Sequence, residues 1–170
     1  EMERQAATRP NPPHLMESAG LAAAQIARDQ LLKSTNNVLI LAGPGNNGGD
    51  GFVVAEALRH AGWPIRVALL GTVSQLKGDA ALAAAAWGGP VEDLTPNLDG
   101  AELIIDALFG AGLARPLEGI AAAVVIAINE RKMPCLSIDL PSGVDGDTGQ
   151  ILGQAPQAQA TVTFFRRKTG

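Results

Sequence analysis

The sequence is poor in features that mark several common classes of protein. It has a single cysteine, Cys135, which excludes an internal disulfide bond; that residue lies in an apolar, strand-like run where a buried and inert thiol is expected. It also lacks an excess of basic residues. The net charge is −4, so no general attraction to nucleic acid or to anionic membranes is expected. An anionic ligand must therefore be held by a local site.

Long hydrophobic runs are absent as well. The opening residues have neither the basic and apolar regions of a signal peptide nor an apolar run long enough to cross a membrane, which favours a cytoplasmic location. The 170 residues are 46% hydrophobic and 18% charged, a composition typical of globular domains. Because no internal repeat or linker interrupts the chain, a single domain over residues 1–170 is predicted.

Apolar runs alternate with helical patterns along the chain. The patterns predict strands at 38–41, 64–70, 102–106, 133–140 and 160–165, and helices at 14–33, 49–61, 75–87 and 120–131. This alternation is typical of βαβ units, which place helices on both faces of a parallel sheet. The predicted fold class is α/β: a Rossmann-like three-layer α/β/α sandwich with a mostly parallel central sheet.

A glycine-rich segment, residues 41–51, joins the first predicted strand to the next helix. Five glycines within residues 43–51 predict positive φ angles and a close approach to a ligand. The positive end of the following helix favours an anion such as a phosphate. Asn46, Asn47 and Asp50 can orient a polar ligand or bind a hard cation. Taken singly, each of these residues could equally form a turn or cap a helix.

Two later strands also end in polar residues. Asp106 closes the third predicted strand, and Asp139 closes the fourth, with Ser142 just beyond it. Parallel strands bring their carboxyl ends to one edge of the sheet, where ligands bind in folds of this class. A lone aspartate at a strand end more often forms a turn or a cap. Two such residues, each beside a glycine-containing loop, favour a functional site.

Two common nucleotide-binding motifs fit poorly. Gly43, Gly45 and Gly48 match the G-x-G-x-x-G spacing, but the second strand ends in Leu-Leu-Gly-Thr at 69–72, without the acidic residue that binds ribose. A P-loop requires a lysine after its glycines, where this chain has Asp50. Ordinary hydride transfer and phosphoryl transfer are therefore disfavoured.

The motifs at 43–51, 106–116 and 138–145, in that order, resemble the YjeF N-terminal domain family, the NAD(P)H-hydrate epimerases. Residues 15–20 and 163–170 resemble the opening helix and the late strand of that family. The resemblance implies an isomerase that interconverts the R and S forms of NADHX and NADPHX, damaged cofactors hydrated at C6 of the nicotinamide ring. A separate ATP- or ADP-dependent dehydratase then repairs the S form.

The resemblance also implies roles for individual residues. A potassium ion is the expected cofactor, bound with help from Asn47, Asp106 and Ser142. For the proton transfers of an epimerisation, Asp139 is the first candidate and Lys168 the second, and Arg115 is expected to hold phosphate. The substrate-binding residues implied are Asn46, Asn47, Gly48, Gly49, Asp50, Gly110, Ala111, Gly112, Leu113, Ala114, Arg115, Pro116 and Asp139.

The resemblance further implies a homodimer formed through the opening helix. Family domains continue with a further helix and strands past the lysine that Lys168 matches, so the domain is expected to be incomplete at its carboxyl end. The dehydratase half that is fused in many bacterial members is expected to be missing from this chain. The alternative function is a non-catalytic nucleotide- or protein-binding scaffold of the same fold. An RNA-binding scaffold should show a basic patch, but the sequence offers only the short run at 166–168.

Overall fold

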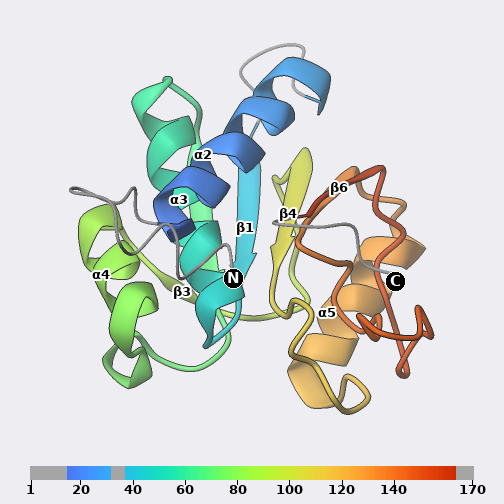
Figure 1. Cartoon of the computed structure of the whole chain (residues 1–170). Coiled ribbons are helices and arrows are strands. Elements are labelled where there is room, and N and C mark those ends of the chain that lie inside the picture. Colours follow the sequence, from blue (N-terminus) through green and yellow to red (C-terminus); the bar gives the residue numbers. More distant parts are fainter. Residues whose placement is uncertain (1–14, 32–36, 164–170) are drawn as a thin grey trace.

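The computed structural model describes residues 15–31 and 37–163, in which six strands form one sheet between layers of helices (Figure 1). The strand order is β3-β2-β1-β4-β5-β6, and every pair of neighbouring strands is parallel. The strands are β1 (Val38–Ala42), β2 (Ile65–Leu69), β3 (Glu92–Asp93), β4 (Leu103–Ala107), β5 (Cys135–Ile138) and β6 (Ala160–Val162). The predicted fold class is confirmed.

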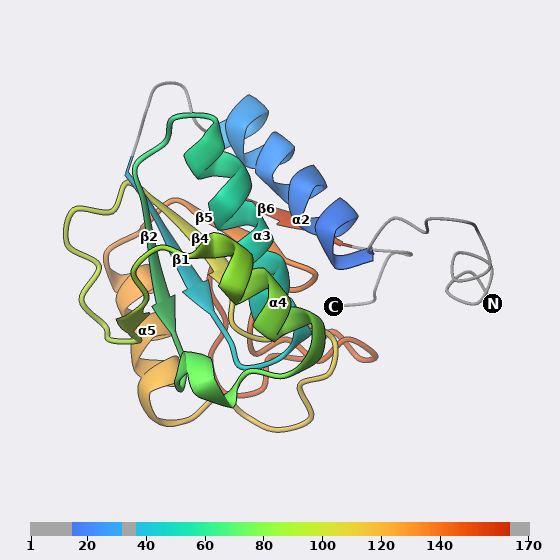
Figure 2. The ribbon, with the colours of Figure 1, turned by 90° about the vertical axis from the view of Figure 1, so that its left-hand side faces the viewer.

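The helices divide between the two faces of the sheet. One face carries α2 (Leu15–Ile26), α3 (Asn46–His60) and α4 (Gly78–Trp87), and the other carries α5 (Gly119–Glu130). Figure 2 shows the same separation from the side. Two short segments complete the described structure: η1 (Ala27–Leu31), a π-helical turn, and η2 (Val73–Gln75), a 3₁₀ turn. No helix among residues 15–31 and 37–163 has the length and apolar character needed to cross a membrane.

The central strand β1 is buried on both sides because successive side chains of a strand point to opposite faces. Val38, Ile40 and Ala42 belong to the apolar cluster under α2, α3 and α4. Leu39 and Leu41 belong to the second cluster, under α5. This explains why β1 appears in the sequence as a continuous apolar run rather than an alternating one.

Three predicted helices differ from the observed ones by more than one residue. The prediction began α3 at residue 49, but α3 begins at Asn46, so residues 46–48 belong to its first turn instead of to a loop. The opening helix, predicted over 14–33, is α2 followed by η1, and its predicted ends fall outside the described residues. The helix predicted at 75–87 starts later, at Gly78, after the turn η2.

The sheet contains one strand that was not predicted. Strand β3 is only Glu92–Asp93, two exposed charged residues that carry no apolar signal. It pairs with Ala68 and Leu69 at the end of β2, and Arg66 of β2 forms two hydrogen bonds of 2.8 Å with the Glu92 carboxylate. The other strands lie within the predicted segments or extend one residue beyond them. The end of the last predicted strand, from residue 164, falls outside the described residues.

Candidate functional site

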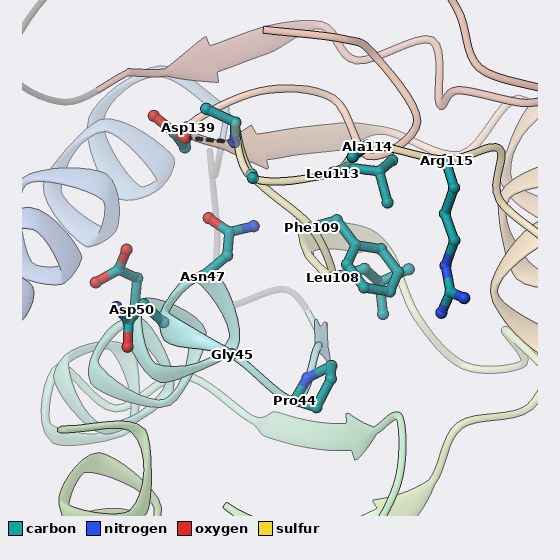
Figure 3. Close-up of a pocket in the computed structure, with 14 residues that line it drawn as sticks. Pro44, Gly45, Asn47, Asp50, Leu108, Phe109, Leu113, Ala114, Arg115 and Asp139 are labelled. Carbon is teal, nitrogen blue, oxygen red and sulfur yellow. Dashed lines mark hydrogen bonds between the residues drawn. The ribbon is translucent and has the colours of Figure 1, made fainter. Parts of the chain in front are cut away.

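A cavity of about 710 Å³ lies at the carboxyl ends of β1 and β4 (Figure 3). From β1 the chain continues outward to β2 and β3 and then returns to β4 on the other side of β1, so the strand order reverses at this point. Ligands of open α/β sheets bind at such switch points. The cavity is lined by Pro44, Gly45, Asn46, Asn47, Asp50, Leu108, Phe109, Gly110, Ala111, Gly112, Leu113, Ala114, Arg115 and Asp139.

Most of the predicted substrate-binding residues line this cavity. Gly48, Gly49 and Pro116 do not line it, and Lys168 lies outside the described residues. Pro44, Gly45, Leu108 and Phe109 line the cavity but were not predicted to bind substrate. All four lie inside the motifs at 43–51 and 106–116, so taking each motif as a whole could have found them.

The glycines of the first motif act differently from the prediction. None of the five has a positive φ angle. A Cβ atom on Gly43 would lie 1.7 Å from the Leu108 carbonyl oxygen, and one on Gly48 would lie 1.8 Å from the Gly43 carbonyl oxygen. These two glycines therefore let the chain approach its own backbone, not a ligand. Gly45 has open space where its Cβ would be and faces the cavity.

The amino end of α3 borders the cavity through Gly45, Asn46 and Asn47. Gly45 is the N-cap residue, and no side chain caps the helix there. The first N–H groups of a helix lack partners within the helix, and its amino end carries partial positive charge. This border of the cavity is therefore suited to an anionic group.

Two carboxyl groups lie at one end of the cavity, on different elements. Asp50 belongs to α3 and has an exposed fraction of 8%. Burial raises the pKa of Asp50 to about 7, and the negative charge of Asp139 contributes to the rise. Asp139 follows β5 and has a φ angle of 68°, which is uncommon for a residue with a side chain.

Asp139 is tied to the loop that follows β4. Its Oδ2 atom accepts a hydrogen bond of 2.9 Å from the Ala111 N–H group, drawn as a dashed line in Figure 3. A Cβ atom on Gly110 would lie 2.7 Å from Asp139 Oδ2 and 3.3 Å from Asn47 Oδ1. The absence of a side chain at Gly110 therefore lets Asp139 and Asn47 meet this loop closely.

Asp106 and Ser142 lie behind the cavity wall in a buried network. The Asp106 carboxylate is fully buried; it accepts hydrogen bonds from Ser142 Oγ (2.5 Å), the Ser142 N–H group (2.8 Å), Ser137 Oγ (2.9 Å) and the Leu108 N–H group (3.4 Å). Ser142 Oγ also accepts a hydrogen bond of 2.9 Å from the Phe109 N–H group. Burial outweighs these hydrogen bonds and raises the pKa of Asp106.

The donor atoms around this network suit a hard cation. Asp106 and Ser142 offer carboxylate and hydroxyl oxygens, and Asn47, on the cavity wall, offers an amide oxygen. The Asp106 carboxylate forms no ion pair with any described residue, and Asn47 Nδ2 is buried without a hydrogen-bond partner among them. A cation would balance the buried charge, and rotating the amide would place Oδ1 where Nδ2 now lies. Within residues 15–31 and 37–163, there is no group of three or more His, Cys, Asp or Glu side chains that could hold a metal ion.

The other end of the cavity is more apolar and carries a positive charge. Phe109 and Leu113 lie there, and Figure 3 shows the Arg115 side chain extending beside them, away from Asp50 and Asp139. Arg115 forms no hydrogen bond or ion pair within residues 15–31 and 37–163. The cavity therefore has acidic groups at one end and a guanidinium group at the other.

Comparisons with known proteins give consistent matches. The profile of a family described as YjeF-related protein N-terminus matches residues 13–170. An NAD(P)H-hydrate epimerase from Limosilactobacillus fermentum is 38% identical, with 92% of this chain and 76% of the relative covered. One from Achromobacter xylosoxidans is 41% identical, with the same coverage of both chains.

Two further matches concern chain length and fold. A bifunctional NAD(P)H-hydrate repair enzyme from Thermofilum pendens is 41% identical over 92% of this chain, which spans only 32% of that relative. The crystal structure of the yeast protein ynu0 superposes with a TM-score of 0.77 at 25% identity, covering 98% of this chain and 79% of the yeast chain. The yeast structure thus shares the fold described above.

Proposed function

The chain belongs to the family of YjeF-related protein N-termini, and from this membership we propose that it is an NAD(P)H-hydrate epimerase. The proposal rests on one observation: residues from all three sequence motifs line the cavity at the switch point. The first motif supplies Asn47 and Asp50, the second supplies the loop from Leu108 to Arg115, and the third supplies Asp139. The names of the similar relatives support this activity over a non-catalytic scaffold.

The charges of the cavity support one orientation of the hydrated dinucleotide. The pyrophosphate is proposed to bind between Arg115 and the amino end of α3 at Gly45 and Asn46, because both are positive. The hydrated nicotinamide ring, which carries no phosphate, is placed at the end formed by Asn47, Asp50 and Asp139. The remaining residues of the loop after β4, Gly110 to Ala114, would contact the substrate along the cavity wall.

The proposed chemistry is loss and return of water at C6. The C6 hydroxyl accepts a proton, the N1 lone pair expels it as water, and a C6=N1 iminium forms. Water then adds to the opposite face, a new C6–O bond forms, and the extra proton leaves. Asp139 is the proposed proton donor and acceptor, because it borders the cavity and its position is fixed by the Ala111 N–H group. Lys168 is the second candidate.

A potassium ion is proposed to bind near Asp106, Ser142 and Asn47. Its charge would offset the buried Asp106 carboxylate and fix the orientation of the Asn47 amide beside the substrate. Ser142 would connect the ion site to the loop after β4 through its hydrogen bond with Phe109. The proposal is supported by the oxygen donors and the uncompensated carboxylate.

The proposed partners follow from the relatives and from the surface. An ATP- or ADP-dependent dehydratase would consume the S form; it corresponds to the second activity implied by the name of the bifunctional relative. A homodimer through α2 is also proposed from the family resemblance; Leu21 on that helix has an exposed fraction of 49%.

An epimerisation assay tests the proposed activity. Purified protein is added to (R)-NADHX with an S-specific dehydratase, ATP and potassium, and the appearance of NADH is followed. We expect the protein to accelerate NADH recovery, and Asp139→Ala to reduce that acceleration at least ~100-fold because a proton-transfer group is lost. The matched control is Asp147→Ala, an exposed residue in the loop after the same strand. A folded protein that gives no acceleration would contradict the proposed function.

A further inference from the structure

We propose that Asp50 is a second catalytic residue, serving one face of the hydrated nicotinamide ring while Asp139 serves the other. The inference rests on the proposed epimerase function and assigns Asp50 a proton-transfer role in addition to substrate binding. It concerns how a single cavity can act on both the R and the S form.

The partners of the three buried or partly buried aspartates distinguish Asp50. Both oxygens of Asp106 are occupied by serine and backbone donors, and Asp139 is held by the Ala111 N–H group. By contrast, the Asp50 carboxyl group makes no hydrogen bond or ion pair with any residue in 15–31 or 37–163, although it has an exposed fraction of only 8%. A carboxyl group that lines a cavity and has no partner among the described residues is available to a ligand bound there, which favours a functional role for Asp50.

The placement of the two carboxyl groups supports action from two sides. Asp50 is near the start of α3, which follows β1, whereas Asp139 follows β5, two strands away from β1 in the sheet. In Figure 3, Asn47 lies between their labelled side chains, and both border the same end of the cavity. Each carboxyl group therefore approaches that end from a different element.

Inversion at C6 requires proton transfer at both faces of a flat iminium. On one face a carboxylic acid gives its proton to the C6 hydroxyl; the C6–O bond breaks, water leaves, and N1 supplies the electrons for the C6=N1 bond. On the other face a carboxylate takes a proton from the entering water as the new C6–O bond forms and N1 regains its electron pair. One water is lost and one gained, one proton passes from one carboxyl group to the other, and no oxidant is needed.

Oxygen exchange in H₂¹⁸O provides a direct test. The epimers are separated, each is incubated with the protein in potassium, and ¹⁸O incorporation and inversion are both measured by chromatography with mass spectrometry, after subtraction of the rate without protein. In Asp50→Asn we expect inversion to fall at least ~100-fold, while one epimer still exchanges its hydroxyl oxygen with retention. In Asp139→Asn we expect the other epimer to exchange its hydroxyl oxygen with retention.

The controls separate this inference from a structural effect and from the proposed function. Asp79→Asn removes an exposed acid from the first turn of α4 and should leave both rates unchanged. Asp50→Ser, which leaves room for water, should reproduce the epimer-selective exchange if the asparagine variant folds poorly. Equal loss of exchange and inversion for both epimers in the folded Asp50 variants would overturn the role of Asp50. Failure of the proposed function would already appear as absence of inversion with the unmodified protein.

Discussion

At the scale of single residues, the three aspartates near the carboxyl edge of the sheet show how surroundings determine the behaviour of one side-chain type. Asp106 is fully buried and surrounded by donors, Asp139 is partly buried and tied to a loop, and Asp50 is buried without partners among the described residues. The sequence predicted that Asp106, at the end of one strand, and Ser142, just beyond another, would lie at the same edge of a parallel sheet. It could not predict the lack of partners at Asp50, which depends on packing from several elements.

The raised pKa of Asp50 predicts a pH dependence of stability. Its pKa in the folded state, about 7, lies above the ordinary value of 3.8, so the folded state binds the proton more tightly. The stability gained from this proton is complete below pH 3.8 and is lost as pH rises through 7. Between pH 5 and 8, we expect the free energy of unfolding to fall by about 2–3 kcal/mol more in the unmodified protein than in Asp50→Asn.

Urea unfolding at several pH values between 5 and 8 measures this difference. Asp79→Asn, whose carboxyl group is exposed, serves as the control and should follow the unmodified protein. A difference between the unmodified protein and Asp50→Asn that stays constant over this pH range would contradict the raised pKa.

At the scale of elements, the turn from β1 into α3 is shaped by contact with the protein's own backbone. Glycine has a low helix propensity, and the glycine-rich sequence therefore suggested a loop at 46–48. In the structure these residues begin α3 because Gly48 must pass close to Gly43, and Gly43 close to Leu108. Such contacts join segments far apart in the sequence, so they override local propensity and cannot be predicted from it. Strand β3 was missed for a similar reason, because Arg66 holds Glu92 there.

Adding a methyl group at Gly48 tests this account. In Gly48→Ala the Cβ would lie 1.8 Å from a backbone oxygen, so the turn must shift, and we expect a loss of about 2–3 kcal/mol in the free energy of unfolding. Gly45→Ala is the matched control, since its Cβ meets nothing within 4 Å; we expect a change of about 0.5 kcal/mol. Equal losses in the two variants, measured by urea unfolding, would mean that close approach does not constrain this turn.

At the scale of the whole molecule, the alternation of strands and helices allowed the layers and the parallel sheet to be predicted. The position of the cavity also follows from the general behaviour of such sheets at a switch point. Leu108 and Phe109 were not predicted to line the cavity, because they look like ordinary core residues in the sequence. Their place in the cavity wall depends on where the loop after β4 turns away from the sheet.

The proposed potassium site predicts a salt-specific gain in stability of the whole fold. A cation that binds only the folded protein raises the melting temperature, so we expect potassium chloride to raise Tm by about 2–5 °C relative to choline chloride at equal ionic strength. Asp106→Asn and Ser142→Ala should both reduce this gain, whereas Asp93→Asn, an exposed residue on β3, should retain it. Thermal unfolding monitored by circular dichroism measures it, and equal Tm values in the two salts would argue against the site.

The two walls of the cavity come from opposite halves of the sheet. The segment from α2 to β3 supplies Gly45, Asn47 and Asp50, and the segment from β4 to β6 supplies the loop after β4 and Asp139. Neither segment alone contains a site, so any intermediate in which only one half has formed has nothing to bind. A ligand that contacts both walls therefore opposes separation of the two halves. Bound ligand should protect both segments from proteolysis, on either side of the β1–β4 pairing.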